Sequence, residues 1–285
     1  MPLVTSKEML SKAQKGGYAV GAFNAENMEM VKAIIQAAEE LKAPVMIQTT
    51  PSTVKYGTVE TYAAIVAAEA AKASAPVCLH LDHGSSFELA MQAMHAGYTS
   101  VMIDGSKLDF EANIAETKRV ADVAKALDIP CEAELGKVGG KEDDLEAEAD
   151  INTDPQEAKE FVERTGVTSL AVAIGTAHGF YVGTPVLDKE RLSEIREVVD
   201  IPLVLHGGSN NPDAEIGQSV TLGVNKINIS SDIKVAYYEK MREVLKDESL
   251  REPNVIQPAC IAAMKETAYH KIELFQADGK AALYR

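Results

Sequence analysis

Residues 77–96 read VCLHLDHGSSFELAMQAMHA and contain one complete strand-to-helix unit. The run from Val77 to Leu81 is apolar almost throughout, which is typical of a strand buried on both faces of a parallel sheet. Asp82 and His83 follow this run, and the amphipathic stretch at 87–96 then predicts a helix. The same order of apolar run, polar residue or glycine, and helical pattern recurs along the whole chain.

Eight such runs are predicted as strands: Tyr18–Phe23, Pro44–Gln48, Val77–Leu81, Thr99–Ile103, Pro130–Glu134, Ser169–Ile174, Pro202–Leu205 and Lys226–Ile229. Helical patterns lie between most of them, beginning with the apolar face of 28–41 and continuing at 58–73, 87–96, 110–127, 155–164, 188–199 and 232–246. Buried strands that alternate with helices predict an α/β fold with a parallel sheet. At this chain length we expect a (β/α)8 TIM barrel, a single domain over residues 1–285 with an extra C-terminal helix near 255–275.

An open, doubly wound sheet is the structural rival. That fold usually places a glycine-rich turn after its first strand, whereas the sequence here reads Phe23-Asn24-Ala25-Glu26. One stretch interrupts the alternation, the acidic segment GKVGGKEDDLEAEADINTD at 136–154. A long polar connection after a barrel strand predicts a lid or a binding loop.

The composition restricts the partners. The formal net charge of −15 opposes binding to nucleic acid and to anionic membranes, so neither is expected as a partner. The same charge opposes a phosphorylated substrate at long range, so a phosphate site must be built locally from backbone amides, a helix N-terminus or a metal.

The cysteines and the N-terminus predict a cytoplasmic protein. The three cysteines are scattered, at Cys78, Cys131 and Cys260, and are interpreted as buried structural thiols in a reducing compartment. The first residues lack the basic and apolar regions of a signal peptide, and no apolar run reaches the length of a transmembrane helix.

A polar or ionisable residue stands at the end of every predicted strand. In barrel enzymes the reactive groups come from these C-terminal strand ends. The residues in this position are Asn24, Thr50, Asp82 with His83, Asp104, Glu134, His178, His206 and Asn228. Their recurrence at one end of eight separate segments predicts an active site there.

Three of these residues are histidines from three different strands. A single histidine is more often a hydrogen-bonded core residue, but three imidazoles with an open coordination position are typical of catalytic zinc. A glycine follows each of His83, His178 and His206, which is expected to leave room for a ligand near the backbone. The other three are predicted not to be ligands: His80, within its strand, and His95 and His270, in helical segments.

The carboxylates at the strand ends have two interpretations each. Asp82, beside His83, either orients a metal ligand or transfers a proton. Asp104 and Glu134 either hydrogen-bond to the ligands or provide an alternate metal position. Two glycine- and serine-rich segments, 206–209 and 228–232, follow the seventh and eighth strands, where barrels often bind phosphate.

These motifs resemble the class II, zinc-dependent ketose-bisphosphate aldolases, including the fructose- and tagatose-bisphosphate aldolases. The similarity extends from Leu3 to about Lys240. The stretches that carry it are GYAV at 17–20, HLDHG at 80–84, SVMID at 100–104, EAELG at 132–136, GGKEDD at 139–144, GTAHG at 175–179 and LHGGS at 205–209. The resemblance implies reversible cleavage of a phosphorylated ketose to dihydroxyacetone phosphate and an aldehyde.

The resemblance also implies roles for individual residues. Zn²⁺ is expected on His83, His178 and His206, with Asp82 exchanging a proton at the substrate's C4 hydroxyl and Glu142 handling the C3 proton of dihydroxyacetone phosphate. The residues expected to bind substrate and its phosphate are Asn24, Thr50, Gly179, Gly207, Gly208, Ser209, Asn228, Ser230 and Ser231. A monovalent cation, Na⁺ or K⁺, and a homodimer or homotetramer are further features that the family implies.

The sequence departs from the family pattern in three places. Asn210-Asn211 replaces the expected glycine after Ser209, and Phe180-Tyr181-Val182 lacks a lysine that is frequent in fructose-specific relatives. Glu252-Pro253-Asn254 stands where an Asp-Pro-Arg segment is common. These differences leave open the choice between fructose, tagatose and another ketose phosphate, and whether Arg251 holds the distal phosphate.

Other functions remain as alternatives. A related zinc aldolase that joins dihydroxyacetone phosphate to a different, non-phosphorylated aldehyde needs the same residues. A Schiff-base aldolase requires a strand lysine, for which Lys226 is the candidate, and leaves the histidines unexplained. A zinc hydrolase does not require two phosphate loops. A non-catalytic sugar-phosphate-binding protein on the same scaffold is the alternative from a different class.

Overall fold

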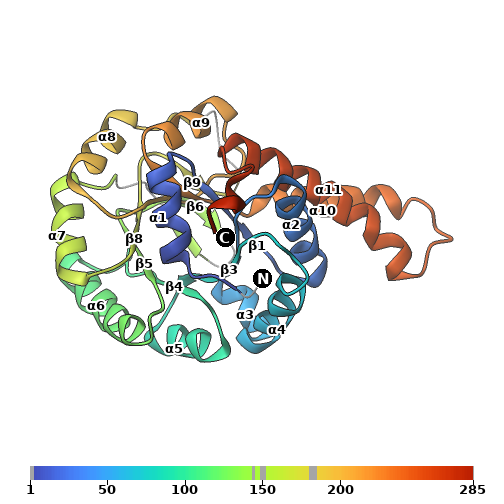
Figure 1. The fold of residues 1–285 in the computed structure, drawn as a ribbon, viewed down its shortest axis with the longest axis horizontal. Helices are drawn as coiled ribbons and strands as arrows, with labels where there is room; N and C mark the ends of the chain where they lie inside the picture. Colours follow the sequence, from blue (N-terminus) through green and yellow to red (C-terminus); the bar gives the residue numbers. More distant parts are fainter. Residues whose placement is uncertain (1–2, 143–144, 148–151, 180–184, 285) are drawn as a thin grey trace.

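The computed structural model describes residues 3–142, 145–147, 152–179 and 185–284. Eight parallel strands close into a barrel in the order β1-β11-β10-β8-β5-β4-β3-β2, and helices surround it (Figure 1). The barrel strands are β1 Val20–Asn24, β2 Val45–Thr49, β3 Val77–Gly84, β4 Ser100–Ile103, β5 Cys131–Leu135, β8 Ser169–Val172, β10 Leu203–Leu205 and β11 Val224–Ile229. The predicted (β/α)8 barrel is therefore confirmed.

The helices lie outside the strands. They are α1 Ser6–Gly16, α2 Met28–Leu41, α3 Pro51–Gly57, α4 Val59–Ala70, α5 Phe87–Ala96, α6 Phe110–Ala126, α7 Pro155–Thr165, α8 Lys189–Val198, α9 Asp213–Thr221, α10 Ser231–Val244, α11 Pro253–Leu274 and the 3-10 helix η1 Lys280–Tyr284. Helix α5 illustrates how the sequence sets their limits. The Ser86 side chain accepts a hydrogen bond from the Leu89 amide at its start, and Gly97 ends the helix at φ 101°.

Helix α1 closes the N-terminal end of the barrel. It lies across this end in Figure 1 and contacts β1, β3 and β11. Its Ser6 side chain is buried and hydrogen-bonds to Ser100 on β4, with 2.8 Å between the two Oγ atoms. The opposite, C-terminal end carries the polar strand ends.

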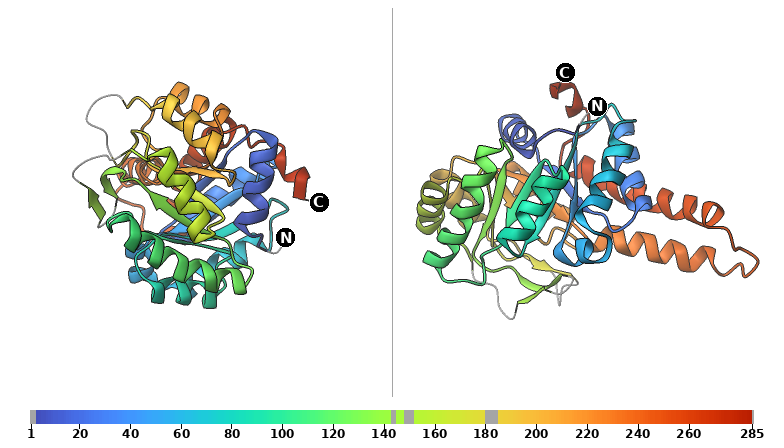
Figure 2. Two further views of the ribbon diagram at one scale, coloured as in Figure 1. Left: turned by 90° about the vertical axis from the view of Figure 1, so that its left-hand side faces the viewer. Right: turned by 90° about the horizontal axis from the view of Figure 1, so that it is seen from below.

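A small second sheet stands at the C-terminal end, far from both termini (Figure 2). It has the order β7-β6-β9, with β6 Gly139–Glu142, β7 Leu145–Ala147 and β9 Ala177–His178. Strands β6 and β7 form an antiparallel hairpin, and β9 pairs in parallel with β6 through Gly139–Ala177 and Gly140–His178. The segment predicted as a polar loop at 136–154 thus contains a hairpin that brings the chain of Glu142 and that of His178 together.

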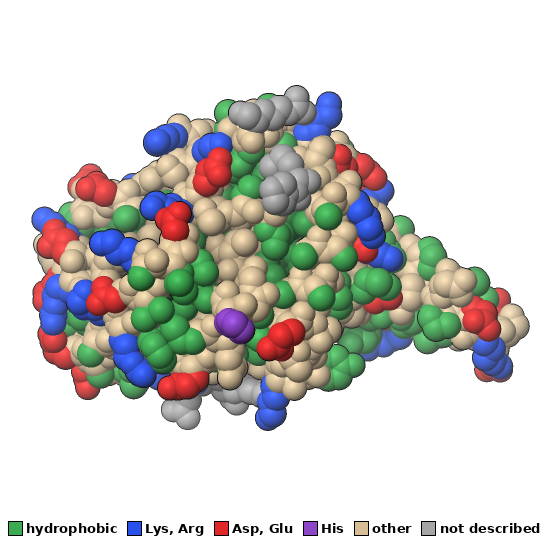
Figure 3. Space-filling model, turned by 60° about the horizontal axis from the view of Figure 1, so that its bottom comes forward, with side chains coloured by type: hydrophobic (Ala, Val, Ile, Leu, Met, Phe, Trp, Pro, Cys, Tyr) green, Lys and Arg blue, Asp and Glu red, His purple; other side chains and the backbone are tan. Residues whose placement is uncertain are grey.

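Helices α10 and α11 extend beyond the barrel as an arm (Figures 1 and 2). The arm exposes apolar side chains, with Tyr238 49%, Leu245 47% and Val255 56% exposed. On the face shown in Figure 3, Lys and Arg side chains lie among Asp and Glu side chains, and hydrophobic side chains appear along the arm. Among the described residues, no helix is long and apolar enough to cross a membrane.

Candidate active site

Asp82 lies at the C-terminal end of β3, fully buried between two amide side chains. Its Oδ2 accepts a hydrogen bond of 2.9 Å from Gln48 Nε2, and its Oδ1 accepts one of 2.9 Å from Asn228 Nδ2. Gln48 Nε2 also donates to Asn24 Oδ1 at 2.7 Å. Strands β1, β2 and β11 therefore fix the carboxylate of β3 in one orientation.

A distortion of β3 brings His83 into the same site as its neighbour. In a regular strand, consecutive side chains point to opposite faces. His83 instead adopts φ 48°, in the left-handed region, and the register with β4 shifts between Leu81 and Gly84. Such a backbone conformation costs about 1–3 kcal/mol for a non-glycine residue, and here it allows Asp82 and His83 to face one centre.

Carboxylates hydrogen-bond to the imidazoles of both His83 and His206. His83 Nδ1 lies 2.8 Å from Asp104 Oδ2, just beyond β4, and His206 Nδ1 lies 2.8 Å from Glu134 Oε2 on β5. The two imidazole ring centres are 4.6 Å apart. A carboxylate on one ring nitrogen fixes the ring and raises the basicity of the other, an arrangement typical of metal-binding histidines.

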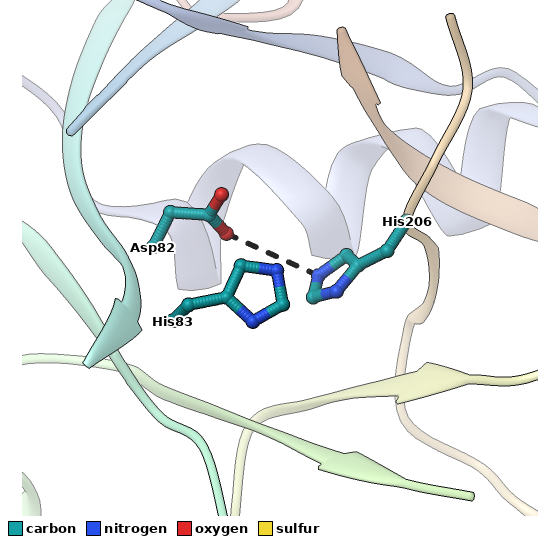
Figure 4. Close-up of side chains that lie close together, drawn as sticks. All are labelled: Asp82, His83 and His206. Carbon is teal, nitrogen blue, oxygen red and sulfur yellow. Dashed lines mark ion pairs between the residues drawn. The ribbon is translucent and has the colours of Figure 1, made fainter. Parts of the chain in front are cut away.

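The donor set fits a divalent metal. Ligand atoms from Asp82, His83 and His206 lie within 4.8 Å of one another (Figure 4), and His206 Nε2 is 4.0 Å from Asp82 Oδ1. A second group, which shares His83, adds Asp104 and Glu134. Imidazole and carboxylate donors in this number are those that Zn²⁺ and related ions use.

Burial and mutual charge shift the pKa values of these groups. Burial alone lowers the pKa of His206, but hydrogen bonds with Glu132 and Glu134 raise it to about 9. Burial likewise opposes protonation of His83, yet the nearby Asp82 and Asp104 hold its pKa well above the ordinary value. Metal ligation requires neutral imidazoles, so a metal that binds here replaces protons, and its affinity falls as the pH falls.

The two predicted phosphate loops come together. Gly208 donates its N–H to the Asn228 carbonyl at 3.0 Å, so the loop after β10 lies against the end of β11. The Ser209 hydroxyl accepts hydrogen bonds from the Ser230 amide at 3.1 Å and the Asp232 amide at 3.3 Å. These amides belong to the start of α10, where N–H groups and the helix dipole favour an anion.

The other predicted residues are placed less fully. Thr50 is buried and caps α3, where its hydroxyl accepts a hydrogen bond from the Thr53 amide at 3.4 Å. The backbones of Glu142 and His178 lie in β6 and β9, but their side chains fall outside the described part of the chain. Gly179 follows β9 with φ 81°. The roles expected of these four residues stay predictions.

The glycines after two of the histidines also meet a packing requirement of the chain itself. A Cβ on Gly84 would lie 2.1 Å from the Met102 carbonyl oxygen, and one on Gly207 would lie 2.4 Å from the Ala177 carbonyl oxygen. Glycine is needed because a neighbouring backbone passes too close for any side chain. Through Gly207, the loop that carries His206 contacts β9 directly.

Several polar residues in the barrel were not among the predicted site residues. Gln48 and Glu132 were not predicted as site residues, and Lys226 was considered only as a Schiff-base lysine. Glu132 precedes Glu134 by two residues and Lys226 precedes Asn228 by two, so the alternation of strand side chains would have placed both inside the barrel. Lys226 is fully buried and forms a 2.9 Å ion pair with Glu132, so its Nζ is engaged by a carboxylate and is not free to attack a carbonyl carbon.

Comparisons with known proteins agree with this geometry. Residues 4–280 match the family model described as fructose-bisphosphate aldolase class-II. The YdjI aldolase from Escherichia coli K12 is 38% identical, with a TM-score of 0.87 over 98% of this chain and 99% of that chain. A Coccidioides immitis protein assigned as a fructose-1,6-biphosphate aldolase is 31% identical, with a TM-score of 0.90 over 97% of each chain.

A third structure, the fructose-bisphosphate aldolase from Campylobacter jejuni, shares the fold at 22% identity, with a TM-score of 0.83 over 98% of this chain and 97% of that chain. The family match covers nearly all of the barrel and includes every strand that contributes to the site. The chain therefore belongs to the class II fructose-bisphosphate aldolase family, whose members are metal-dependent aldehyde-lyases that act on phosphorylated sugars.

Proposed function

We propose that this protein is a zinc-dependent aldolase that reversibly cleaves a ketose 1,6-bisphosphate, either tagatose- or fructose-1,6-bisphosphate, to dihydroxyacetone phosphate and glyceraldehyde 3-phosphate. One observation carries the proposal, the convergence of Asp82, His83 and His206 within 4.8 Å. A proton acceptor and two metal ligands thus share one buried centre, as cleavage next to a ketone requires.

Asp82 is the proposed proton acceptor. Retro-aldol cleavage removes the C4 hydroxyl proton, breaks the C3–C4 bond and moves the bonding electrons toward the ketone oxygen. A bound metal supplies Lewis-acid stabilisation of that negative charge. Burial raises the pKa of Asp82, but the nearby His83, Lys226 and His206 outweigh it and lower the pKa below the ordinary value. The carboxylate is therefore ionised and able to accept the proton.

Unused amide groups around Asp82 suit a polyhydroxylated substrate. Within the described part of the chain, Asn24 Nδ2, Gln48 Oε1 and Asn228 Oδ1 are buried and make no hydrogen bond. Buried polar atoms are normally paired, so these atoms are candidates to bind substrate hydroxyl and carbonyl groups. The phosphate is proposed to bind at Gly207, Gly208, Ser209, Ser230 and Ser231, together with Gly179.

Three further roles follow from the family resemblance. His178 is proposed as the third zinc ligand, supported by the contact between its strand, β9, and the loop of His206. Glu142 is proposed to exchange the C3 proton, supported by the pairing of its strand, β6, with β9. From the strand-end pattern, Asp104 is proposed to orient His83 through their 2.8 Å contact, and Glu134 to offer an alternate metal position together with His83 and Asp104.

Chelation and one substitution test the proposal. We expect EDTA to abolish cleavage and Zn²⁺ to restore it, while borohydride with substrate leaves no adduct on the protein. Asp82→Asn keeps the size of the side chain, so zinc content should stay unchanged while kcat falls about 10²- to 10⁴-fold. Cleavage that survives complete chelation contradicts the metal mechanism. A wild-type protein that binds zinc and dihydroxyacetone phosphate without turnover instead supports the binding-protein alternative.

The alternative with a different aldehyde depends on the distal phosphate, for which Arg251 is the candidate residue. Arg251 lies in the turn between α10 and α11, at the far end of the arm, and its guanidinium donates to the Leu250 carbonyl at 2.8 Å (Figure 2). From the arm, Arg251 would hold the distal phosphate in the barrel of a neighbouring subunit, as an arginine of this region does in some members of the family. A coupled assay over fructose-1,6-bisphosphate, tagatose-1,6-bisphosphate and ketose 1-phosphates decides between the two. Comparable kcat/KM for the 1-phosphates favours the non-phosphorylated aldehyde.

We also infer four broader properties. One core cluster includes residues from Met9 to Ala277, which supports a single domain. The apolar side chains of the arm support a homodimer or homotetramer. The three cysteines are free and buried, which supports a reducing, cytoplasmic location. A monovalent cation beside the phosphate follows from the family resemblance alone.

A further inference from the structure

The interior of the barrel below Asp82 is ionic, whereas such barrels are usually filled by branched aliphatic side chains. Lys226 on β11 and His80 on β3 are fully buried, and Glu132 on β5 is 1% exposed. Removing charges from water is costly, and an apolar trio of similar volume is often at least as stable. Packing alone does not account for these residues.

Lys226 links the other two side chains. Its ammonium donates to Glu132 Oε1 at 2.9 Å and to His80 Nε2 at 3.4 Å. Because an ammonium can only donate, His80 Nε2 accepts, and its Nδ1–H therefore donates to Ser100 Oγ at 2.7 Å. His80 is thus held as one neutral tautomer, and the ammonium position is fixed from two sides.

Glu132 extends this arrangement to the metal site. Its Oε1 lies 3.1 Å from His206 Nε2, and its Oε2 accepts a hydrogen bond from Ser169 Oγ at 3.4 Å. Glu132 therefore has partners on both oxygens, and its ionised form can only accept from His206. The Glu132 carboxylate is also a potential competitor of the imidazoles for the metal, because His80, Asp82 and Glu132 have ligand atoms within 4.8 Å of one another.

We propose that Lys226 is a positioning residue that holds Glu132 as the acceptor of the His206 Nε2–H, which leaves Nδ1, the nitrogen that faces Glu134 here, as the one that would bind the metal. The inference rests on the proposed role of His206 as a ligand. Without the ammonium, Glu132 carries an unpaired charge beside a cation site. It is then free to turn toward the cation, and the orientation of His206 is lost.

Single and double substitutions test this role through metal binding. Lys226→Met removes only the ammonium, and we expect the zinc dissociation constant, measured by competition with a chromophoric chelator, to rise about 10- to 100-fold. The visible absorption of the Co²⁺-substituted protein should change with it. The double variant K226M/E132Q buries no unpaired charge and keeps an acceptor oxygen for His206, so its zinc affinity should return toward wild type. K226M/E132L lacks that oxygen and should remain weak.

Lys271→Met is the matched control. Lys271 on α11 is 6% exposed and forms a 2.9 Å ion pair with Asp232, so its loss also removes a buried ion pair but should leave zinc affinity unchanged. Wild-type zinc affinity and cobalt absorption in Lys226→Met overturn the inference, as does equal affinity of the two double variants. If Lys226→Met does not fold, the double variants decide. A wild-type protein that binds no zinc refutes the proposed function instead.

Discussion

Gly84→Ala is expected to disrupt the metal site through backbone packing alone. The new Cβ would lie 2.1 Å from the Met102 carbonyl oxygen, whereas real Cβ atoms essentially never approach within 3.0 Å. Strands β3 and β4 must then separate by about 0.9 Å, because a carbonyl oxygen cannot rotate away as a flexible side chain can. That shift takes the 2.8 Å contact between His83 Nδ1 and Asp104 Oδ2 beyond hydrogen-bond range.

The expected magnitude combines two effects. Overpacking costs about 1–3 kcal/mol, and loss of a hydrogen bond to a charged group costs about 1.5–3 kcal/mol. The free energy of unfolding should therefore fall by about 2.5–6 kcal/mol, as measured by urea denaturation with and without Zn²⁺. The zinc dissociation constant should rise about 10- to 100-fold, because His83 loses its orienting carboxylate.

Gly217→Ala is the control of identical chemistry. Gly217 lies within α9, and its Cβ would make an ordinary 3.6 Å contact with Leu274 Cδ1. Alanine should stabilise this helix by about 0.5–1 kcal/mol, with zinc affinity unchanged. If Gly84→Ala retains the wild-type denaturation midpoint and zinc affinity, the close approach of β3 and β4 does not hold the site together.

Two further predictions follow from the contacts of the site and the core. Asp104→Asn should lower zinc affinity about 10-fold or more, because a neutral amide raises the basicity of His83 less than a carboxylate does; an unchanged chelator titration contradicts this. Burial raises the pKa of Cys78 and Cys131 to about 12. In the unfolded chain these thiols have a pKa of about 8.5. The free energy of unfolding should therefore fall as the pH rises from that value toward 12. A urea midpoint that is no lower at pH ~10.5 than at pH ~8 would refute this prediction.

The barrel strands were predictable because each is a buried apolar run with a polar residue at its end. The strand predicted at 77–81 begins where β3 begins, at Val77, but β3 continues to Gly84. The extension arises from the bulge and the left-handed backbone of His83, which depend on contacts with β4. A positive φ is adopted by only a few per cent of non-glycine residues, so it was not expected at this histidine.

Three α-helices, α1, α3 and α9, were not predicted, because their local sequence signals are weak. Helix α9 has few buried positions, chiefly Ile216, Ser219 and Val220, and includes a glycine, so its helical period is weak. Helix α3 spans only seven residues, and α1 precedes the first predicted strand. The sheet of β6, β7 and β9 begins with Gly139-Gly140, which disfavour strands locally, and its pairing with β9 joins segments far apart in the sequence.

The charged residues of the site were predictable only in part. Asp82, Glu134 and Asn228 stand at strand ends, where the pattern of a barrel draws attention to them. Glu132 and Lys226 lie one layer deeper, where an aliphatic residue is the ordinary expectation. Their ion pair becomes intelligible only when β5 and β11 are seen to face one another across the barrel.

This deeper layer explains how an acidic protein maintains a cation site without excess negative charge at its centre. Four carboxylates surround the imidazoles of His83 and His206: Asp82, Asp104, Glu132 and Glu134. If all four were free to chelate, the cation would have several competing positions. Amide donors hold Asp82, a histidine holds each of Asp104 and Glu134, and Lys226 holds Glu132. Asp82, Asp104 and Glu132 are thereby restricted to accepting a proton or orienting a ligand, which leaves one nitrogen on each imidazole, His83 Nε2 and His206 Nδ1, for the metal.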